Sequence, residues 1–208
     1  VHVGYWMDGV VRNVNITTPG GTPFYNKGGN GYDDSIYTAY EFDAGGDTAF
    51  TRSYIGFKFL GALENEDLYH PDVVEGFNVH YNSWQFSNAS DPLYFEPQSD
   101  ASRFSKLSLG FNNNPNLNWP TIQSNLKTAN NRSHLLSVGP FETLEPGESV
   151  QVVFALVLAK MNETGEALTE DSQGQRAILR QNASCAQIIF NGEDENFNGI
   201  LDPGEDLY

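Results

Sequence analysis

Residues 194–205 read D-E-N-F-N-G-I-L-D-P-G-E and carry oxygen-bearing side chains at the spacing of an EF-hand calcium loop. Calcium is a hard cation that takes six to eight oxygen ligands. Gly199, in the sixth position, allows the sharp turn that wraps the chain around the ion. The spacing predicts side-chain ligands at loop positions 1, 3, 5, 9 and 12 and a backbone carbonyl at position 7: Asp194, Asn196, Asn198, Asp202, Glu205 and Ile200.

The sequence around this loop predicts a weak, structural site. Pro203 and Gly204 precede Glu205, which is less helical than the end of a paired EF-hand, and the pattern occurs once in the sequence. A lone loop suits extracellular calcium at roughly 10⁻³ M. We therefore expect calcium to be the cofactor and to stiffen the C-terminal segment, because a ligand that binds only the folded state stabilises that state.

Four aspartates around an earlier segment offer further cation ligands. Asp33, Asp34, Asp43 and Asp47 lie at the two ends of one predicted strand, where loop oxygens could bind a second calcium ion. The competing interpretation is ordinary turn chemistry, since Asp-Asp and Gly-Gly-Asp sequences are common in turns. The sequence leaves both interpretations open and favours the turns.

The three tryptophans are candidates for stacking on sugar rings. Trp119 lies in the polar segment 112–120, which we expect to be an exposed loop, so it is the best candidate. Trp84 lies in a predicted strand and is undecided, whereas Trp6 is expected to pack in the core. These residues make polysaccharide a candidate ligand.

Recognisable catalytic motifs are missing from the sequence. It contains no H-E-x-x-H, no G-x-S-x-G, no P-loop and no dinucleotide-binding fingerprint. The chain has 27 acidic residues, and nothing in the sequence selects two of them as a glycosidase pair. We therefore expect a protein that is not an enzyme.

The charge balance restricts the partners. With 27 acidic and 11 basic residues, the formal net charge is −16, which repels the phosphate backbone of nucleic acids and anionic membrane surfaces. No apolar run is long enough to span a membrane. The single cysteine excludes an internal disulfide, a composition that fits a cytosolic protein and also fits bacterial secreted proteins that rely on calcium.

Hydrophobic patterning predicts a β-sandwich with one long helix at its C-terminal end. Alternation over 36–43 predicts a half-buried strand, and alternation over 54–60 and 77–86 predicts two more. The uninterrupted apolar run 152–158 predicts a central strand that is buried on both faces. Helical spacing over 169–190 predicts the long helix, and 100–109 predicts a short one, whereas 18–31 is expected to be a long loop. The fold class is thus all-β, immunoglobulin-like or jelly-roll-like, with a sandwich over 1–165 and the helix and calcium loop over 166–208.

Three segments resemble a group of known proteins. The run NGEDENFNGILDPGEDLY is similar to calcium loops of large secreted bacterial surface proteins and to the calcium loop of dockerin modules. The run LLSVGPFETLEPGESVQVVFALVLA, over 135–159, and the pair SIYTAYEFDAGGD and SYIGFKFLGA resemble strands of the same group, many of whose members are exported by the type IX pathway. The resemblance implies an extracellular β-sandwich that is secreted or held at the cell surface, and it implies no reaction.

From these observations we expect a non-enzymatic structural or assembly module of a bacterial surface protein. Its expected partners are calcium and copies of itself or neighbouring surface domains. One alternative is a carbohydrate-binding module of a secreted degradative system. The other is a hydrolase whose carboxylates come together only in the fold.

Calcium is predicted to raise the thermal midpoint of unfolding, and magnesium or a chelator is not. At a calcium concentration 100 times the dissociation constant, the gain is about 2.7 kcal/mol. The Glu205→Gln variant should lose this gain, because the last ligand of the loop normally supplies both carboxylate oxygens. Direct calcium titration is the second measurement, and no binding to the unmodified chain would refute the predicted site.

Overall fold

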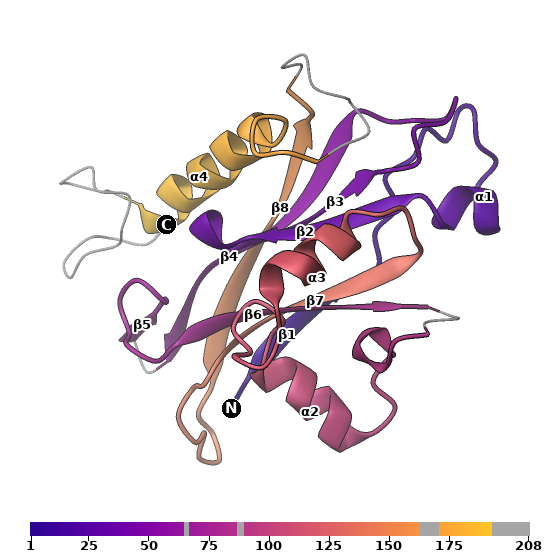
Figure 1. Cartoon of the computed structure of the whole chain (residues 1–208). Helices are drawn as coiled ribbons and strands as arrows, with labels where there is room; N and C mark the ends of the chain where they lie inside the picture. Colours follow the sequence, from indigo (N-terminus) through magenta and orange to yellow (C-terminus); the bar gives the residue numbers. More distant parts are fainter. Residues whose placement is uncertain (65–66, 87–89, 163–170, 193–208) are drawn as a thin grey trace.

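The computed structural model of the chain describes residues 1–64, 67–86, 90–162 and 171–192, which form two antiparallel β-sheets with helices around them (Figure 1). The chain is mostly β with a C-terminal helix, as expected. The smaller sheet has the strand order β1 (Val3–Met7), β7 (Arg132–Gly139) and β6 (Asn78–Gln85). In the larger sheet, β4 (Ser53–Glu64) pairs with three strands, and one of these, β3 (Thr38–Asp43), also pairs with β2 (Gly28–Asp33). The other two are β5 (Asp67–Tyr69) and β8 (Val150–Lys160).

The main hydrophobic core lies between the two sheets. From the larger sheet, Tyr32, Phe57 and Phe59 are at most 5% exposed, and from the smaller sheet Tyr81 and Leu136 are at most 1% exposed. The rings of Tyr32 and Tyr81 stack across the interior with centroids 5.4 Å apart. Burial of these large apolar surfaces is the main force that holds the two sheets together.

Helices cover the outer faces of both sheets. Helix α2 (Asp100–Ser108) packs on β6 and β7, and α4 (Ala177–Asn191) packs on β4 and β8. Helix α3 (Trp119–Leu126) lies against β2 and contributes two buried side chains to the core, Ile122 and Leu126. The short helices are α1 (Thr22–Tyr25), η1 (Asp34–Ile36) and η2 (Pro92–Tyr94). Within the described ranges, no helix combines the length and the hydrophobicity needed to cross a bilayer.

Strand β3 is buried on both faces, so the prediction of a half-buried strand is wrong. Ala39 faces the core between the sheets, whereas Tyr40 and Phe42 belong to a second cluster with Leu179 and other residues of α4. The alternating pattern could not reveal this, because the face that carries Tyr40 and Phe42 is covered by a helix that lies far away in the sequence.

Strand β2 replaces part of the long loop that we expected over 18–31. Its sequence is Gly-Gly-Asn-Gly-Tyr-Asp, and Gly29 pairs with Phe42 while Gly31 pairs with Tyr40 on β3. A Cβ atom on Gly29 would lie 2.4 Å from the Phe42 ring, and one on Gly31 would lie 2.3 Å from the Tyr40 ring. The aromatic rings of β3 therefore lie across the glycines and cover the bare backbone.

Strand β8 lies at an edge of the larger sheet, which corrects the prediction of a central, fully buried strand. Among the described residues it pairs with β4 alone. Leu156 and Leu158 are 63% and 60% exposed, and of its eleven residues only Val157 is buried. An apolar run does not distinguish a strand between two neighbours from one that leaves an apolar edge uncovered.

The helix predictions are confirmed for the most part. The segment 100–109 is helix α2, with Ser99 as its N-cap, and 169–190 is confirmed for its second half as α4. The expected loop over 112–120 is wrong at its end, because α3 begins at Trp119 with Asn118 as its N-cap and Pro120 in its first turn. The predicted domain boundary between residues 165 and 166 lies outside the described residues, and α4 packs directly on the larger sheet.

A carboxyl group and an imidazole face each other inside the core. Glu41 of β3 is 3% exposed and His134 of β7 is 1% exposed, with His134 Nε2 3.6 Å from Glu41 Oε1. Asn30 Nδ2 donates to Glu41 Oε1 at 3.3 Å. Burial raises the pKa of Glu41 well above its usual value and lowers the pKa of His134 to about 3, so burial favours the neutral form of both groups.

We expect Glu41→Gln to become more stable than the unmodified chain as the pH rises. The folded carboxyl keeps its proton while the unfolded one loses it above about pH 4.3, so stability falls with rising pH by up to about 1.4 kcal/mol per pH unit until the folded group ionises. An amide of the same shape removes this loss. Urea denaturation of the variant and of the unmodified chain at pH 5 and pH 8 measures the difference in their free energies of unfolding. If this difference does not grow toward pH 8, the buried carboxyl of Glu41 is not neutral.

Candidate functional site

The predicted calcium loop lies outside the described residues. Its six predicted ligands, Asp194, Asn196, Asn198, Ile200, Asp202 and Glu205, all fall within 193–208. The described chain reaches α4, which ends at Asn191, so the helix expected before the loop is present. The calcium site itself stays a prediction.

Asp43 and Asp47 lie together around one arginine. Arg12 Nη1 lies 2.8 Å from both carboxylate oxygens of Asp43, and its Nη2 lies 2.8 Å from Asp47 Oδ1. Asp43 is fully buried and also accepts hydrogen bonds from the backbone N–H groups of Gly45 and Thr51, each at 3.0 Å. Lys27 Nζ lies 3.2 Å from Asp47, so the oxygens of this pair are already neutralised by cationic side chains.

Asp33 and Asp34 do not join the Arg12 cluster, and each has a partner of its own. Asp33 Oδ2 lies 2.8 Å from Arg180 Nη1, whereas Asp34 Oδ2 accepts a hydrogen bond from Trp119 Nε1 at 3.2 Å. Burial raises the pKa of Asp34. In the part of the chain that the structure describes, no three His, Cys, Asp or Glu side chains are grouped so as to hold a metal ion. A second calcium site at the four aspartates stays a prediction, and it would have to displace arginine from three of them, Asp33, Asp43 and Asp47.

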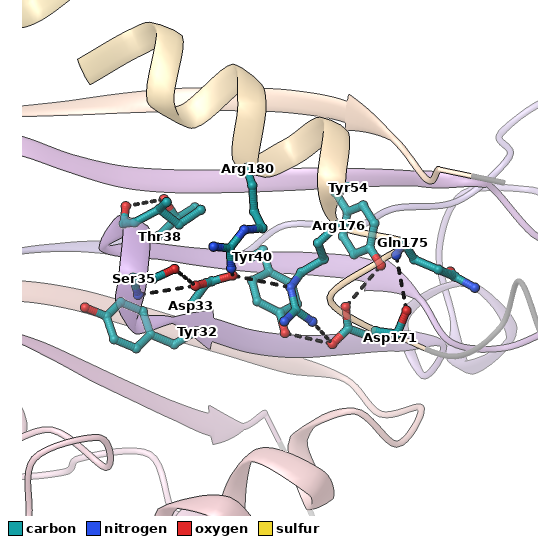
Figure 2. A network of polar contacts seen from close by, with 12 residues as sticks. Tyr32, Asp33, Ser35, Thr38, Tyr40, Tyr54, Asp171, Gln175, Arg176 and Arg180 are labelled. Atoms are coloured by element: carbon teal, nitrogen blue, oxygen red, sulfur yellow. Dashed lines mark hydrogen bonds and ion pairs between the residues drawn. The ribbon is translucent and has the colours of Figure 1, made fainter. Parts of the chain in front are cut away.

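A buried ion-pair network fastens α4 to the larger sheet (Figure 2). Asp171, with a fully buried side chain, lies just before the helix and accepts a hydrogen bond from Arg176 Nη1. The Tyr40 hydroxyl donates to Asp171 Oδ2 at 2.8 Å, and the Tyr54 hydroxyl donates to Oδ1 at 3.0 Å. Lys127, the residue after α3, adds an ion pair, with its Nζ 3.1 Å from Asp171 Oδ2.

Asp33 at the end of β2 forms the other half of this network. It contacts Arg180 at 2.8 Å, and Arg176 Nε lies 3.7 Å from the same oxygen. The Arg176 guanidinium also stacks over the Tyr40 ring at 4.7 Å. Figure 2 shows Arg180 reaching from the helix to Asp33 of β2, and Arg176, at the start of the helix, lying between Asp33 and Asp171. The two carboxylates face two arginines and the partly exposed Lys127, so each buried carboxylate has a counter-charge, which is the condition for a buried ion pair to be tolerated.

The tryptophans proposed for sugar stacking are packed. Trp84 is 7% exposed in β6, so it presents no free ring face to a sugar. Trp119 is partly buried against the main core, with its ring centroid 6.0 Å from that of Tyr81. Trp6, expected in the core, is instead 51% exposed, because it lies on the outer face of β1, which is an edge strand.

The two long sides of the sandwich differ. On one side, α3 fills the space between the sheets next to β2. On the other side, β1 and β8 are the edges of their sheets, and Tyr5 stacks on Phe57 at 4.1 Å while remaining 49% exposed. Leu156 and Leu158 lie on the same face of β8 as the core residue Phe154, yet they extend beyond it into solvent. This open edge, formed by Tyr5, Leu156 and Leu158, is the candidate binding surface.

A shallow groove continues the open edge toward the start of β4. It has a volume of ≈ 450 Å³, and its lining includes Val10, Ile55 and Leu158. Sequence analysis missed this surface because it assigned the strand 152–158 to the centre of a sheet. The sequence carried no signal that could have found it, because an apolar run has the same pattern at the centre and at the edge of a sheet.

Comparisons with models of protein families, with curated proteins and with solved structures found no match. The function of the chain is therefore inferred from its own residues.

We expect Asp171→Asn to cost about 3–5 kcal/mol of stability, because it leaves Arg176 buried without its main counter-charge. The measurement is the free energy of unfolding from urea titration. Asp100→Asn is the matched control, since Asp100 forms a solvent-exposed pair with Arg103. It should leave the unfolding midpoint unchanged. Similar effects of the two substitutions would show that the network does not hold α4 in place.

Proposed function

We propose that the chain is a non-enzymatic structural module of a bacterial cell surface or extracellular matrix, stabilised by calcium, in which a second copy of the chain pairs along β8. In this proposal the sandwich is of the immunoglobulin-like or jelly-roll-like kind, and the protein is secreted or held at the cell surface. The observation that carries the proposal is the long apolar strand β8 at the edge of the larger sheet, with Leu156 and Leu158 exposed.

An exposed apolar edge is a template for strand addition. Its outward N–H and C=O groups are free to pair with another chain, and natural proteins usually protect such edges with charge, proline or a covering element. Strand β8 is eleven residues long, contains no proline, and carries a single charged residue, Lys160. In the part of the chain that the structure describes, Asn182 of α4 occupies one backbone group of this strand, since it donates to the Leu158 carbonyl at 2.8 Å.

A second copy is the occupant that fits this edge best. Two β8 strands related by a two-fold axis would run antiparallel in one continuous sheet, and the exposed leucines of both copies would lie side by side on the same face. Pairing near the strand centre brings Lys160 close to the partner's turn that carries Glu145 and Glu148, both exposed. Because the whole chain has a net charge of −16, copies repel each other over most of their surface, and the nearly uncharged edge is where contact costs least.

The sequence resemblance supports the same proposal. Strand β8 lies within the run 135–159 that resembles secreted bacterial surface proteins, so neighbouring surface domains are the natural alternative partners for this edge. The two alternative functions have weaker support. Tyr5 and Trp6 are exposed aromatics, but as successive residues of a strand they lie on opposite faces and form no platform for a sugar.

We expect the unmodified chain to dimerise and the double substitution Leu156→Lys with Leu158→Lys to weaken dimerisation by more than tenfold. Burying a leucine contributes about 1.5–3 kcal/mol, and 1.4 kcal/mol corresponds to tenfold in affinity. Sedimentation equilibrium in calcium buffer measures the dissociation constant. Ile16→Lys is the control, because Ile16 is 59% exposed in a turn away from β8. A monomer at all concentrations, or equal weakening by the control, would refute the proposal.

A charge reversal tests the orientation of the partner. Lys160→Glu should weaken the dimer, because it places like charges next to the partner's Glu145 and Glu148. The additional change Glu148→Lys should restore part of the affinity. If each substitution alone has no effect, the two copies do not meet in the antiparallel arrangement.

A further inference from the structure

A pocket of ≈ 240 Å³ lies on the outer side of the larger sheet, beside the C-terminal half of α4. One part of its lining is apolar and includes Leu60, Leu68, Ile188 and Phe190. Another part is formed by four ionisable side chains, Tyr37, Lys58, His70 and Asp72. Because binding sites for drug-sized molecules usually measure about 300–1,000 Å³, this pocket suits a smaller ligand.

Lys58 brings a buried positive charge to the pocket. The residue is 3% exposed, and its Nζ donates to the Ile36 carbonyl at 2.8 Å. The Nζ atom also lies 5.9 Å from the centre of the Tyr37 ring. Among the described residues, no carboxylate lies within 4.0 Å of this ammonium group, which can donate three hydrogen bonds. Burial lowers the pKa of Lys58 to about 8, against the opposing effect of the nearby Asp72 charge, so the group remains mostly charged at pH 7.

His70 is held with a second donor beside this charge. The backbone N–H of Asp72 donates to His70 Nδ1 at 3.3 Å, so the neutral ring carries its proton on Nε2. His70 Nε2 is buried and has no hydrogen-bond partner among the described residues. Burial lowers the pKa of His70 to about 4, which keeps the ring neutral at pH 7.

The carboxylate of Asp72 is close enough for its charge to act on Lys58, but the two groups form no direct ion pair. Instead, the carboxylate accepts a hydrogen bond from the Tyr37 hydroxyl and lies 3.4 Å from His70 Nδ1. Tyr37 is held for this contact by a left-handed backbone conformation, with φ of 47°, which non-glycine residues seldom adopt. The polar part of the pocket thus offers two donors, Lys58 and His70, beside the Asp72 carboxylate and the amide of Gln187.

We propose that this pocket binds a small monocarboxylate, whose carboxylate group pairs with Lys58 and whose hydrocarbon part lies against Leu60, Leu68 and Phe190. An incoming anion would supply the direct ion-pair partner that the buried ammonium lacks. The apolar lining would gain contact with a short alkyl chain, as in other small-molecule sites that combine a few polar groups with hydrophobic walls. This site is separate from the β8 edge, so it is independent of dimerisation.

The charged form of Lys58 makes binding depend on pH. The ionisable groups that line the pocket beside it are Asp72 and His70, from the turn after β5, and Tyr37, from the turn before β3. The α4 residues in the lining are uncharged: Ser184, Gln187, Ile188, Phe190 and Asn191. Affinity should therefore be constant near pH 7 and should fall as the pH is raised well above the Lys58 pKa of about 8, with proton uptake on binding.

The test is titration of the full chain with hexanoate and with hexanamide, followed by calorimetry and by NMR chemical shifts. We expect hexanoate to bind about tenfold or more tightly than the neutral amide. Lys58→Met should abolish this preference, and circular dichroism will show whether the variant is folded. Absence of saturable hexanoate binding, or equal binding of acid and amide, would overturn the proposal.

A pair of neighbouring residues on α4 provides a control that does not alter the buried lysine. Ile188 lines the pocket and is 51% exposed, whereas Ile189 is 71% exposed and is not part of the lining. Ile188→Glu should weaken hexanoate binding by about tenfold or more, because it places a negative charge at the pocket. Ile189→Glu should leave binding unchanged. Equal effects of both substitutions would mean that hexanoate binds elsewhere.

Discussion

The position of α4 depends on a buried arginine, Arg176, that lies between two carboxylates, Asp33 and Asp171. Removing these charges from water is costly, and the cost is offset only because hydroxyl groups of Tyr40 and Tyr54 complete the hydrogen bonds of Asp171. With the helix fixed in this place, the outer face of the larger sheet is covered. The burial of β3 on both faces and the pocket beside the helix both follow from this one arrangement.

Sequence patterns predicted what depends on neighbours along the chain. The period of two located the strands over 36–43 and 54–60, and helical spacing located α2 and α4. They did not predict which face of a strand a distant element covers. Asp33 and Arg180, which lie 147 positions apart, illustrate the reason, because the partner of a charged side chain is set by the three-dimensional fold.

The same limit applies to the candidate sites. Lys58 alternates with Phe57 and Phe59 in the sequence, which assigns it to the face opposite the core but does not say that α4 covers that face. The calcium loop, by contrast, is a local pattern in which spacing alone carries the chemistry, so the sequence predicts it even though it lies outside the described residues. A site assembled from separate strands leaves no such local pattern.

The glycines of β2 also set how this strand pairs with β3. A slip of two residues would place the ring of Phe42 or Tyr40 opposite the side chain of Lys27 or Asp33 instead of a bare glycine backbone. Such a slip would also move Asp33 away from its arginines. The pairing of glycines on β2 with aromatic rings on β3 thus fixes the register of the two strands. Hydrophobic alternation alone would allow a shift of two residues, because such a shift leaves every side chain on its original face. The pattern of small and large residues disfavours that shift.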